Sequence, residues 1–344
     1  MTETLTRLAH QFQRFGEREC LPASPLYARL AVGIAGDEQL LRLAAAALAR
    51  PVPNLFFGAV QYLLLTGITH PLAAFYPALS DAPLDIHQHD PFVVFRAFCL
   101  AHAEAMSALL KRRRVQTNEV RRCACLLPAF TLVHQYGGQR PLALVEVGTS
   151  AGLNLLWDRY HYDYGEQSCG DPASPVQLHC ALRGPARPPV PQHMPEIASR
   201  IGLDLHPIDV HDEAEALWLR ALIWPEQRDR VVYLQQAIGL AQAESLQLRA
   251  GDAITLLPDV MAQVPPGATL CLYHTFVLNQ FQQAAREQFR QLLDAFGAAR
   301  DFSVVGIEWQ EPAPPLTLMT YRNGTRSEQI LATCDAHGAW LEWA

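Results

Sequence analysis

Residues 144–154, which read LVEVGTSAGLN, constrain the fold more than any other part of the chain. An apolar run carries one acid, Glu146, and opens into a Gly-x-x-x-Gly turn. Glycine permits a tight turn and lets a ligand approach the backbone, and a helix that follows offers free N–H groups. Ligands of open α/β sheets bind at the carboxyl ends of the strands. The segment therefore predicts a first parallel strand at 142–147, with a ligand site at its end.

The chain after this segment alternates between short apolar strands and amphipathic helices. This alternation predicts a Rossmann-like, mostly parallel sheet that is covered on both faces. We expect strands at 176–182, 203–210, 246–249, 269–274 and 302–308, helices at 213–223 and 228–244, and a terminal hairpin of 316–322 with 330–334.

The chain before this segment reads as helices separated by proline-rich breaks. We expect helices at 4–15, 25–35, 37–49, 55–66, 91–112 and 118–136. Gly137 and Gly138 end the last of them, as glycine commonly does. The expected organisation is an all-helical N-terminal domain, residues 1–138, and a Rossmann-like domain, residues 139–344, with an insertion around 160–200.

Composition and charge exclude some classes of function. Residues 1–138 carry 13 Lys and Arg against 10 Asp and Glu, whereas the remainder carries 14 against 24. An acidic α/β half argues against nonspecific nucleic-acid binding. No apolar stretch is long enough to span a membrane, and the N-terminus does not resemble a signal peptide. The eight cysteines are scattered without a C-x-x-C pair, which indicates buried free thiols in a reducing compartment. We expect a cytoplasmic protein without a metal site.

The segment around Glu146 resembles motif I of class I S-adenosylmethionine-dependent methyltransferases. That motif reads apolar-acid-apolar-Gly-x-Gly-x-Gly, and here Ser150 stands where the middle glycine is expected. The resemblance implies that S-adenosylmethionine is the cofactor and that the fold is methyltransferase-like. The cofactor contacts that it implies in this segment are Glu146, Gly148, Thr149, Ser150, Gly152 and Asn154.

Later segments are similar to further parts of the same family. Residues 246–253 resemble the strand and Gly-Asp turn whose acid, here Asp252, reads the adenine amino group. Residues 269–276 resemble the fourth strand, where His274 is a candidate base for an oxygen nucleophile. The acid that would bind the ribose hydroxyls is Asp209, with Asp163 as the alternative. The fourth strand lacks Asn-Pro-Pro-Tyr, so methylation of base or amide nitrogens is not indicated.

A second resemblance covers nearly the whole chain. Residues 117–120, 148–165 and 223–227, together with His337-Gly338, resemble DUF2332, a bacterial family designated only as a domain of unknown function. This resemblance implies a methyltransferase-like fold and supplies no activity.

Two other functions compete with a small-molecule methyltransferase. Residues 148–152 also spell G-x-S-x-G, the nucleophile elbow of α/β-hydrolases, with Ser150 as nucleophile and Asp252 and His337 as possible partners. Only helices precede this turn and no oxyanion segment lies upstream, so we expect Ser150 not to be a nucleophile. The remaining alternative is a non-catalytic protein that binds S-adenosylmethionine or a nucleoside.

Three weaker patterns each have a structural and a functional interpretation. The pair His87 and His89 with Asp90 is more typical of a polar loop than of a metal site. Residues 224–227 with Arg230 form either a substrate lid or a turn between helices. Tyr160, Tyr162 and Tyr164 are spaced for one strand face, where packing is favoured over substrate stacking.

Overall fold

The computed structural model describes residues 2–344. Its α-helices are α1 Glu3–Arg14, α2 Pro25–Ala35, α3 Glu38–Ala44, α4 Val52–Leu65, α5 Phe92–Ala101, α6 Ala103–Arg112, α7 Cys123–Tyr136, α8 Glu213–Ala221, α9 Arg228–Gln242, α10 Ala253–Ala262 and α11 Gln283–Ala299. Its strands are β1 Leu142–Val147, β2 His161–Asp163, β3 Ser168–Gly170, β4 Gln177–His179, β5 Ala181–Arg183, β6 Ile197–Asp204, β7 Gln247–Ala250, β8 Thr269–Thr275, β9 Phe302–Ile307, β10 Pro315–Arg322, β11 Thr325–Cys334 and β12 Trp340–Trp343. A π-helix, η1 Phe15–Cys20, and four 3-10 helices, η2 Pro71–Phe75, η3 Val120–Arg122, η4 Leu153–Arg159 and η5 Leu278–Gln280, complete the regular elements of these residues.

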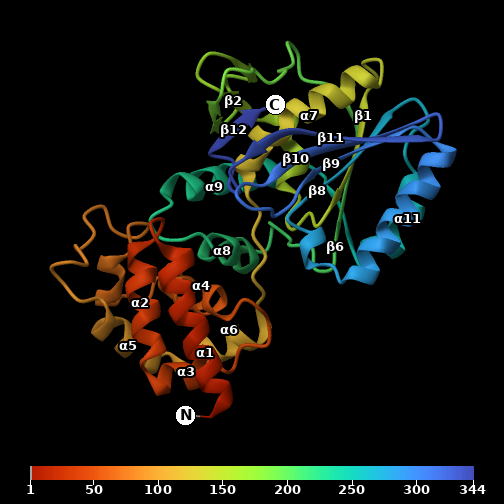
Figure 1. Ribbon diagram of the computed structural model, residues 1–344. Helices are drawn as coiled ribbons and strands as arrows, with labels where there is room; N and C mark the ends of the chain where they lie inside the picture. The colour runs from red at the N-terminus through yellow and green to blue at the C-terminus, as the bar shows by residue number, and fades with distance from the viewer. Residues whose placement is uncertain (1) are drawn as a thin grey trace. The chain divides into compact units, whose positions relative to one another are not determined.

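The chain forms two compact units, and each contains two separate stretches of sequence (Figure 1). The helical unit consists of residues 1–117 and 211–232, and the sheet unit consists of residues 118–210 and 233–344. Helix α7 belongs to the sheet unit by its contacts, and α8 belongs to the helical unit. The expected domain boundary at 138/139 was drawn from glycine spacing alone and remains a prediction about where one folding domain ends.

The helical unit is built around aromatic side chains of α1, α2 and α4. Phe57 stacks on Tyr27, with ring centroids 4.2 Å apart, and Phe12 meets Phe56 edge to face at 5.7 Å. Gln61 connects this core to the segment that follows α8. Its side-chain oxygen accepts from the Tyr27 hydroxyl, and its side-chain amide donates to the Ile223 carbonyl. The expectation that the first part of the chain is helical is confirmed.

The helix expected at 91–112 is two helices. The chain breaks at His102, which has φ −112° and ψ 23°, and α5 and α6 meet at a bend of 79°. The His102 ring packs against Phe98 at 4.6 Å between centroids. Apolar periodicity continues across the break, which is why the sequence predicted one helix.

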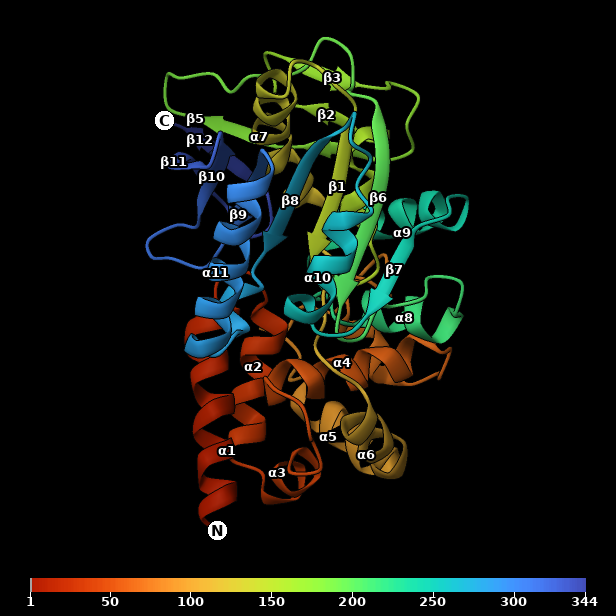
Figure 2. The same cartoon turned by 90° about the vertical axis from the view of Figure 1, so that its right-hand side faces the viewer.

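The sheet unit holds a nine-stranded mixed sheet within the described residues, in the order β5-β12-β11-β10-β9-β8-β1-β6-β7 (Figure 2). The five strands from β9 to β7 are parallel to one another, β10 is antiparallel to β9, and β10 and β11 form the expected antiparallel hairpin. An α/β architecture with β1 as its first strand, at the expected residues, is confirmed. Residues 160–200 contain a separate three-stranded sheet, β3-β2-β4, and the short edge strand β5.

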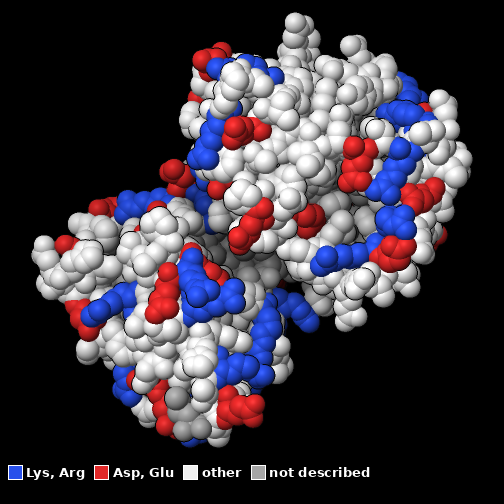
Figure 3. Space-filling model, viewed as in Figure 1, with Lys and Arg blue, Asp and Glu red and all other residues white. Residues whose placement is uncertain are grey.

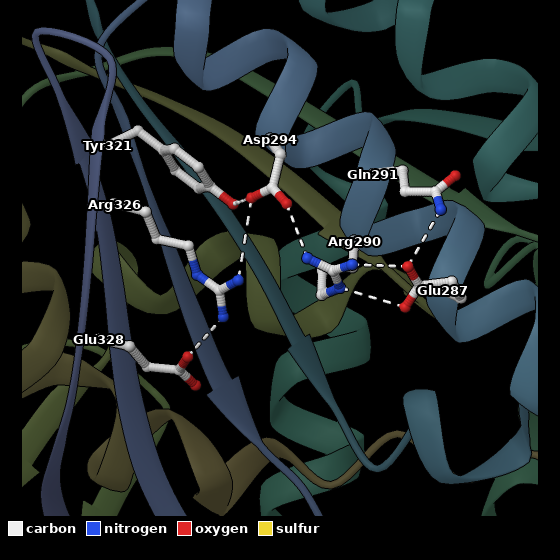
Figure 4. Close-up of polar contacts among 7 residues, drawn as sticks. All are labelled: Glu287, Arg290, Gln291, Asp294, Tyr321, Arg326 and Glu328. Atoms are coloured by element: carbon white, nitrogen blue, oxygen red, sulfur yellow. Dashed lines mark hydrogen bonds and ion pairs between the residues drawn. The ribbon is translucent and has the colours of Figure 1, made fainter.

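Helices cover both faces of the large sheet. Phe130 of α7 packs against Tyr273 of β8, with centroids 5.1 Å apart, on one face. Leu257 of α10 and Phe289 of α11 share a core with Val145 and Leu272 on the other. Helix α11 is also fixed to the β10–β11 hairpin, where Tyr321 donates to Asp294 and charged pairs continue along the helix. Figure 4 shows this network of Glu287, Arg290, Gln291, Asp294, Tyr321, Arg326 and Glu328.

Two expectations about local structure are wrong, and the differences change which residues form the candidate site. The second parallel strand is β6 Ile197–Asp204, whereas 203–210 was expected. The helix expected after the glycine turn is the 3-10 segment η4, which is kinked at Leu156. Several of its carbonyls accept from side chains: Tyr160 donates to Leu153 and Arg200 donates to Leu155. Those bonds replace the ones an α-helix would make.

Candidate functional site

The crossover pattern of the parallel strands defines one place for a site. The chain runs from β1 to β6 and β7 on one side, then returns past β1 to β8 and β9 on the other. Strands β1 and β8 are therefore neighbours whose connections leave in opposite directions. Open α/β sheets bind ligands at such a switch point, at the carboxyl ends of the strands.

Glu146 lies in β1 beside this point and is buried, with 1% of its surface exposed. Its carboxyl group accepts from the Thr149 hydroxyl at 2.7 Å and from the Asn154 amide at 3.4 Å. Tyr273, its register partner on β8, faces the same group, yet the Tyr273 hydroxyl has no hydrogen bond of normal geometry within residues 2–344. Glu146 is therefore hydrogen-bonded to Thr149 of the glycine turn and to Asn154, which follows the turn.

Burial dominates the electrostatics of this carboxyl group. Loss of hydration raises the pKa of Glu146 to about 8, although Thr149, Asn154 and Tyr273 favour its ionised form. The charge of Asp204 adds to the increase. No ion pair to Glu146 exists among residues 2–344 that would offset the cost of burying its charge. The group is therefore mostly a neutral acid at pH 7, and a cation near it would favour the release of its proton.

Most N–H groups of the glycine turn have protein partners. Gly148 and Thr149 both donate to the Leu203 carbonyl, and Ser150 donates to the Asp204 carboxylate at 2.9 Å. Ser150 has a φ of +54°, and its buried hydroxyl has no partner among the residues described. Unpaired N–H groups were the physical basis of the expected ligand contacts at this turn, and these three are occupied.

Asp204 is a candidate site residue that was not expected from the sequence. It ends β6, accepts from the N–H groups of Ser150 and His206, and its carbonyl accepts from Gly251. It thereby joins the ends of β1, β6 and β7. The sequence does contain an acid at this strand end. In a strand that begins at Ile197, the acid at the carboxyl end is Asp204 and not Asp209.

The other predicted acids lie in three different settings. Asp252 follows β7 and the Gly251 turn, is exposed, and caps α10 by accepting from Ile254 at 2.8 Å. Asp209 is exposed and lies beyond the end of β6. Asp163 lies on β2 in the three-stranded sheet and accepts from Gly165, with His179 3.0 Å away. The carboxyl ends of adjacent strands thus bring together Glu146, Asp204 and Asp252, whereas Asp163 lies outside the large sheet.

His274 points to the sheet face opposite Glu146. Its register partner is Val147, and its ring meets Phe289 of α11 edge to face at 6.3 Å. Its Nδ1 is 2.7 Å from Glu308, which also accepts from the N–H groups of Val277 and Leu278. Burial opposes ionisation of Glu308, but these bonds outweigh it and lower the pKa of that carboxyl group.

The 3-10 helix η3 and the residues before it contact two segments that are distant in sequence, the glycine turn and His337-Gly338. The buried Asn118 side chain accepts from Leu153 at 3.1 Å, directly after the glycine turn. Arg121 donates to the His337 carbonyl. A Cβ at Gly338 would lie 2.4 Å from the Arg121 carbonyl, so only glycine fits there. Residues 117–120, the glycine turn and His337-Gly338 therefore pack as one assembly.

These are also segments that carried the resemblance to one family. The model of DUF2332, described as an uncharacterized protein conserved in bacteria, matches residues 9–343. The chain belongs to the DUF2332 family. Comparison with curated proteins and with solved structures finds no match. DUF2332 membership names no activity, so the chemistry has to be argued from the geometry of the site.

The remaining motifs of this DUF2332 chain have structural surroundings. Trp224 packs against Phe15 at 5.7 Å and Glu226 accepts from Leu26, so residues 224–227 form part of the helical core. The hydroxyls of Tyr160, Tyr162 and Tyr164 donate to backbone carbonyls from buried positions, in agreement with packing. Ser150 has no imidazole hydrogen-bonded to its hydroxyl within the residues described, although a serine nucleophile requires an adjacent base.

Three further features of the DUF2332 chain bear on ligands. An open hollow lies on the three-stranded sheet, lined by polar residues that include His161, Asp163 and His179. Across residues 2–344, His, Cys, Asp and Glu side chains form no group of three or more placed to hold a metal ion. No single described helix is long and apolar enough to cross a membrane, and α5 and α6 pass that test only as a bent pair.

Proposed function

We propose that the sheet unit binds S-adenosylmethionine and that the protein transfers its methyl group to a small molecule. One observation carries the proposal. Three neighbouring parallel strands, β1, β6 and β7, bring Glu146, Asp204 and Asp252 to their shared carboxyl edge, and the connection after β1 is a glycine turn. Carboxylates at such an edge accept hydrogen bonds from ribose hydroxyls and from an exocyclic amino group.

The acids at this edge fit the cofactor with one change from the sequence expectation, whereas the N–H groups of Gly148, Thr149 and Ser150 are bonded within the protein. In this proposal Asp204, in place of Asp209, would accept from the ribose hydroxyls, and Asp252 would accept from the adenine amino group. Glu146 is buried beside the turn and is a neutral acid at pH 7, so it would interact with the methionyl part as a hydrogen-bonding group that ionises only when a cation is near. The cofactor supplies an electrophilic methyl group when bound.

The chain's own contribution to transfer would be positioning and a base. Positioning of two reactants accounts for about 7–11 kcal/mol of acceleration in favourable cases. His274 stays the candidate base. If its Nδ1 donates to Glu308, its Nε2 is the atom that accepts a proton.

A non-catalytic binding protein is the second candidate, and the position of His274 favours it. His274 projects toward α11, whereas Glu146 faces α7, so the proposed base and the buried acid lie on opposite faces of the sheet. An enzyme would convert S-adenosylmethionine to S-adenosylhomocysteine in the presence of an acceptor, whereas a binding protein would only be stabilised by either compound.

A thermal-shift screen followed by calorimetry tests the proposal. We expect S-adenosylmethionine and S-adenosylhomocysteine to raise the melting temperature, and NAD and ATP to have less effect. Asp204→Asn should weaken S-adenosylhomocysteine binding by about 1.5–3 kcal/mol, the range for a hydrogen bond to a charged group. Asp252→Asn should weaken it less, because an amide oxygen still accepts from an amino group. Absence of wild-type binding at millimolar concentration would remove the cofactor assignment.

A further inference from the structure

Phe276 adopts a backbone conformation that a bulky residue rarely takes. Its φ is +55°, and it follows β8 directly at the carboxyl edge of the sheet. Ser150, with φ +54°, is the third residue after β1, in the glycine turn. The described non-glycine residues with positive φ are Gln139, Ser150, Phe276 and Asn323. Two of them, Ser150 and Phe276, lie in the turns that follow the neighbouring parallel strands β1 and β8, beside the switch point. Strain of this kind persists only where the surroundings hold it in place.

The surroundings of Phe276 hold it with a set of hydrogen bonds. Its N–H donates to the Ile307 carbonyl at 2.8 Å. Glu308 accepts from the next three N–H groups, those of Val277, Leu278 and Asn279, while its carboxylate is also bound by His274. Glu308, held in place by its hydrogen bond with His274, thus fixes the whole turn that carries the Phe276 ring.

The turn places Phe276 beside an exposed tryptophan. Trp309 follows Glu308 in sequence, lies 6.3 Å from Phe276 between ring centroids, and has 58% of its surface exposed. The Arg122 guanidinium lies 4.4 Å over the Phe276 ring. An exposed tryptophan alone is ordinary, but here it adjoins a strained aromatic residue and a cation at the end of two parallel strands.

The Phe276–Trp309 pair also lies next to the glycine turn. A Cβ on Gly148 would be 2.1 Å from a methyl carbon of Val277, so the turn after β8 touches the turn after β1. The acids proposed for the nucleoside lie on β1, β6 and β7, on one side of the switch point. The aromatic pair lies on the β8 and β9 side, where a second reactant would have to approach.

We propose that Phe276 and Trp309 bind the methyl acceptor, a small planar phenol that stacks on the exposed Trp309 ring. This inference rests on the proposed function for the transfer itself, and the binding site stands on its own geometry. In the transfer, the phenol oxygen would give its proton to Nε2 of His274, the candidate base, and form a bond to the methyl carbon, while the carbon–sulfur bond of the sulfonium would break and leave a neutral thioether. The positive charge of Arg122 over the Phe276 ring favours an ionisable hydroxyl on a ligand bound at the pair.

Calorimetric titration of the full chain with 2-naphthol tests the site directly, with cyclohexanol as a non-planar control. We expect millimolar or tighter binding of 2-naphthol and none of cyclohexanol. Trp309→Ala should weaken 2-naphthol binding about fivefold or more, because it removes the stacking surface. Trp309→Phe should stay within about twofold of wild type, since it keeps an aromatic ring. Ile330→Ala is the matched control, because Ile330 is 59% exposed on β11, and it should change nothing.

Titration of the same variants with S-adenosylhomocysteine separates this inference from the proposed function. If Trp309→Ala binds 2-naphthol as wild type does, or if wild type does not bind it, the aromatic site is wrong whatever the cofactor result. If 2-naphthol binding depends on Trp309 but S-adenosylhomocysteine does not bind wild type, the aromatic site stands and the methyl-transfer role fails. Both stand if S-adenosylhomocysteine binds wild type and Trp309→Ala equally while 2-naphthol binding depends on Trp309.

Discussion

At the scale of single residues, several buried polar groups near the end of β1 lack a hydrogen-bonding partner or a counter-charge. Glu146 has no counter-charge among the residues described, and the hydroxyls of Ser150 and Tyr273 lack hydrogen bonds of normal geometry. Buried polar groups are nearly always paired in folded proteins, so exceptions call for an explanation. Their position at the switch point is consistent with a ligand that pairs with them, and the stability of variants measures what these groups cost the folded protein.

Glu146 should make stability depend on pH in a defined direction. Its folded pKa of about 8 exceeds the ordinary 4.5, so between these values the folded chain holds a proton that the unfolded chain releases. The free energy of unfolding should therefore fall as pH rises across that window, by up to about 1.4 kcal/mol per pH unit. Glu146→Gln has no such proton and should lose this part of the slope. Urea unfolding at pH 5.5, 6.5 and 7.5 measures it, and equal slopes for both proteins would contradict the prediction.

Ser150→Gly should stabilise the protein by about 1 kcal/mol. Glycine adopts a φ of +54° without the steric cost that serine has there, and the change removes a buried hydroxyl without a partner. Ser150→Ala is the control, because it removes the hydroxyl and keeps the strained backbone. Chemical denaturation of the three proteins gives the difference, and a destabilised Ser150→Gly variant would show that the hydroxyl has a role that we have not identified.

Ser150 should also be inert as a nucleophile. Its hydroxyl is buried and has no base bound to it within residues 2–344. A fluorophosphonate probe should leave the protein unlabelled, as read by intact mass. Labelling that disappears in Ser150→Ala would revive the hydrolase interpretation.

At the scale of elements, helix α11 fits the β10–β11 hairpin through a close contact rather than through its charges. Gly297 lies against Tyr321, whose ring stacks on Phe302 with centroids 4.6 Å apart. The charged network in Figure 4 runs along the exposed side of the same helix. Exposed ion pairs contribute little each, so the close contact should dominate the stability of this packing.

Gly297→Ala should destabilise the protein by about 1–3 kcal/mol, the usual cost of overpacking. The new Cβ would lie 1.9 Å from a ring carbon of Tyr321, which cannot move away from Phe302 easily. Gly239→Ala in α9 is the matched control, since its Cβ meets nothing within 4 Å. That change should be neutral or stabilising by roughly 0.5–1 kcal/mol, because alanine favours helix. Thermal unfolding of both variants decides the matter, and equal effects would contradict the packing argument.

At the scale of the whole molecule, the chain passes repeatedly between its two compact units. Trp218 and Leu222 of the helical core come from the segment 211–232, far from the first 117 residues in sequence. Phe130 of α7 packs in the sheet unit. The face drawn in Figure 3 carries interspersed basic and acidic side chains, in keeping with a modest net charge of −7. The expectation that the protein does not bind nucleic acid remains a prediction.

Division of the chain at 138/139 should therefore yield fragments that fold poorly. A fragment of residues 1–138 lacks Trp218 and Leu222, and a fragment of 139–344 lacks α7 and exposes Tyr273. We expect neither fragment to melt cooperatively by circular dichroism. A fragment of 118–344 should retain more structure than 139–344, because it keeps α7. Cooperative melting of 139–344 at the full-length temperature would contradict this.

The sequence determined by itself what depends on local pattern. The bounds of β1 and α2 were predicted to the residue, because a six-residue apolar strand that opens into glycine and a Ser-Pro helix start are local signals. The alternation of strands and helices likewise predicted an α/β sheet, and glycine predicted the tight turn after β1, where Gly148 has a φ of +75°.

Only the tertiary structure decided where strands end, which depends on their pairing register, and which residues distant in sequence contact one another. The shift of β6 by several residues replaced Asp209 with Asp204, because strand ends are set by pairing with β1 and not by composition. The Tyr160 and Arg200 side chains donate to carbonyls of η4, and residues at the end of β6 accept from N–H groups of the glycine turn, so no α-helix formed there. The alternation of β8 placed Tyr273 and His274 on opposite faces of the sheet. A sequence lists these residues as neighbours, and packing separates them because successive side chains of a strand point in opposite directions.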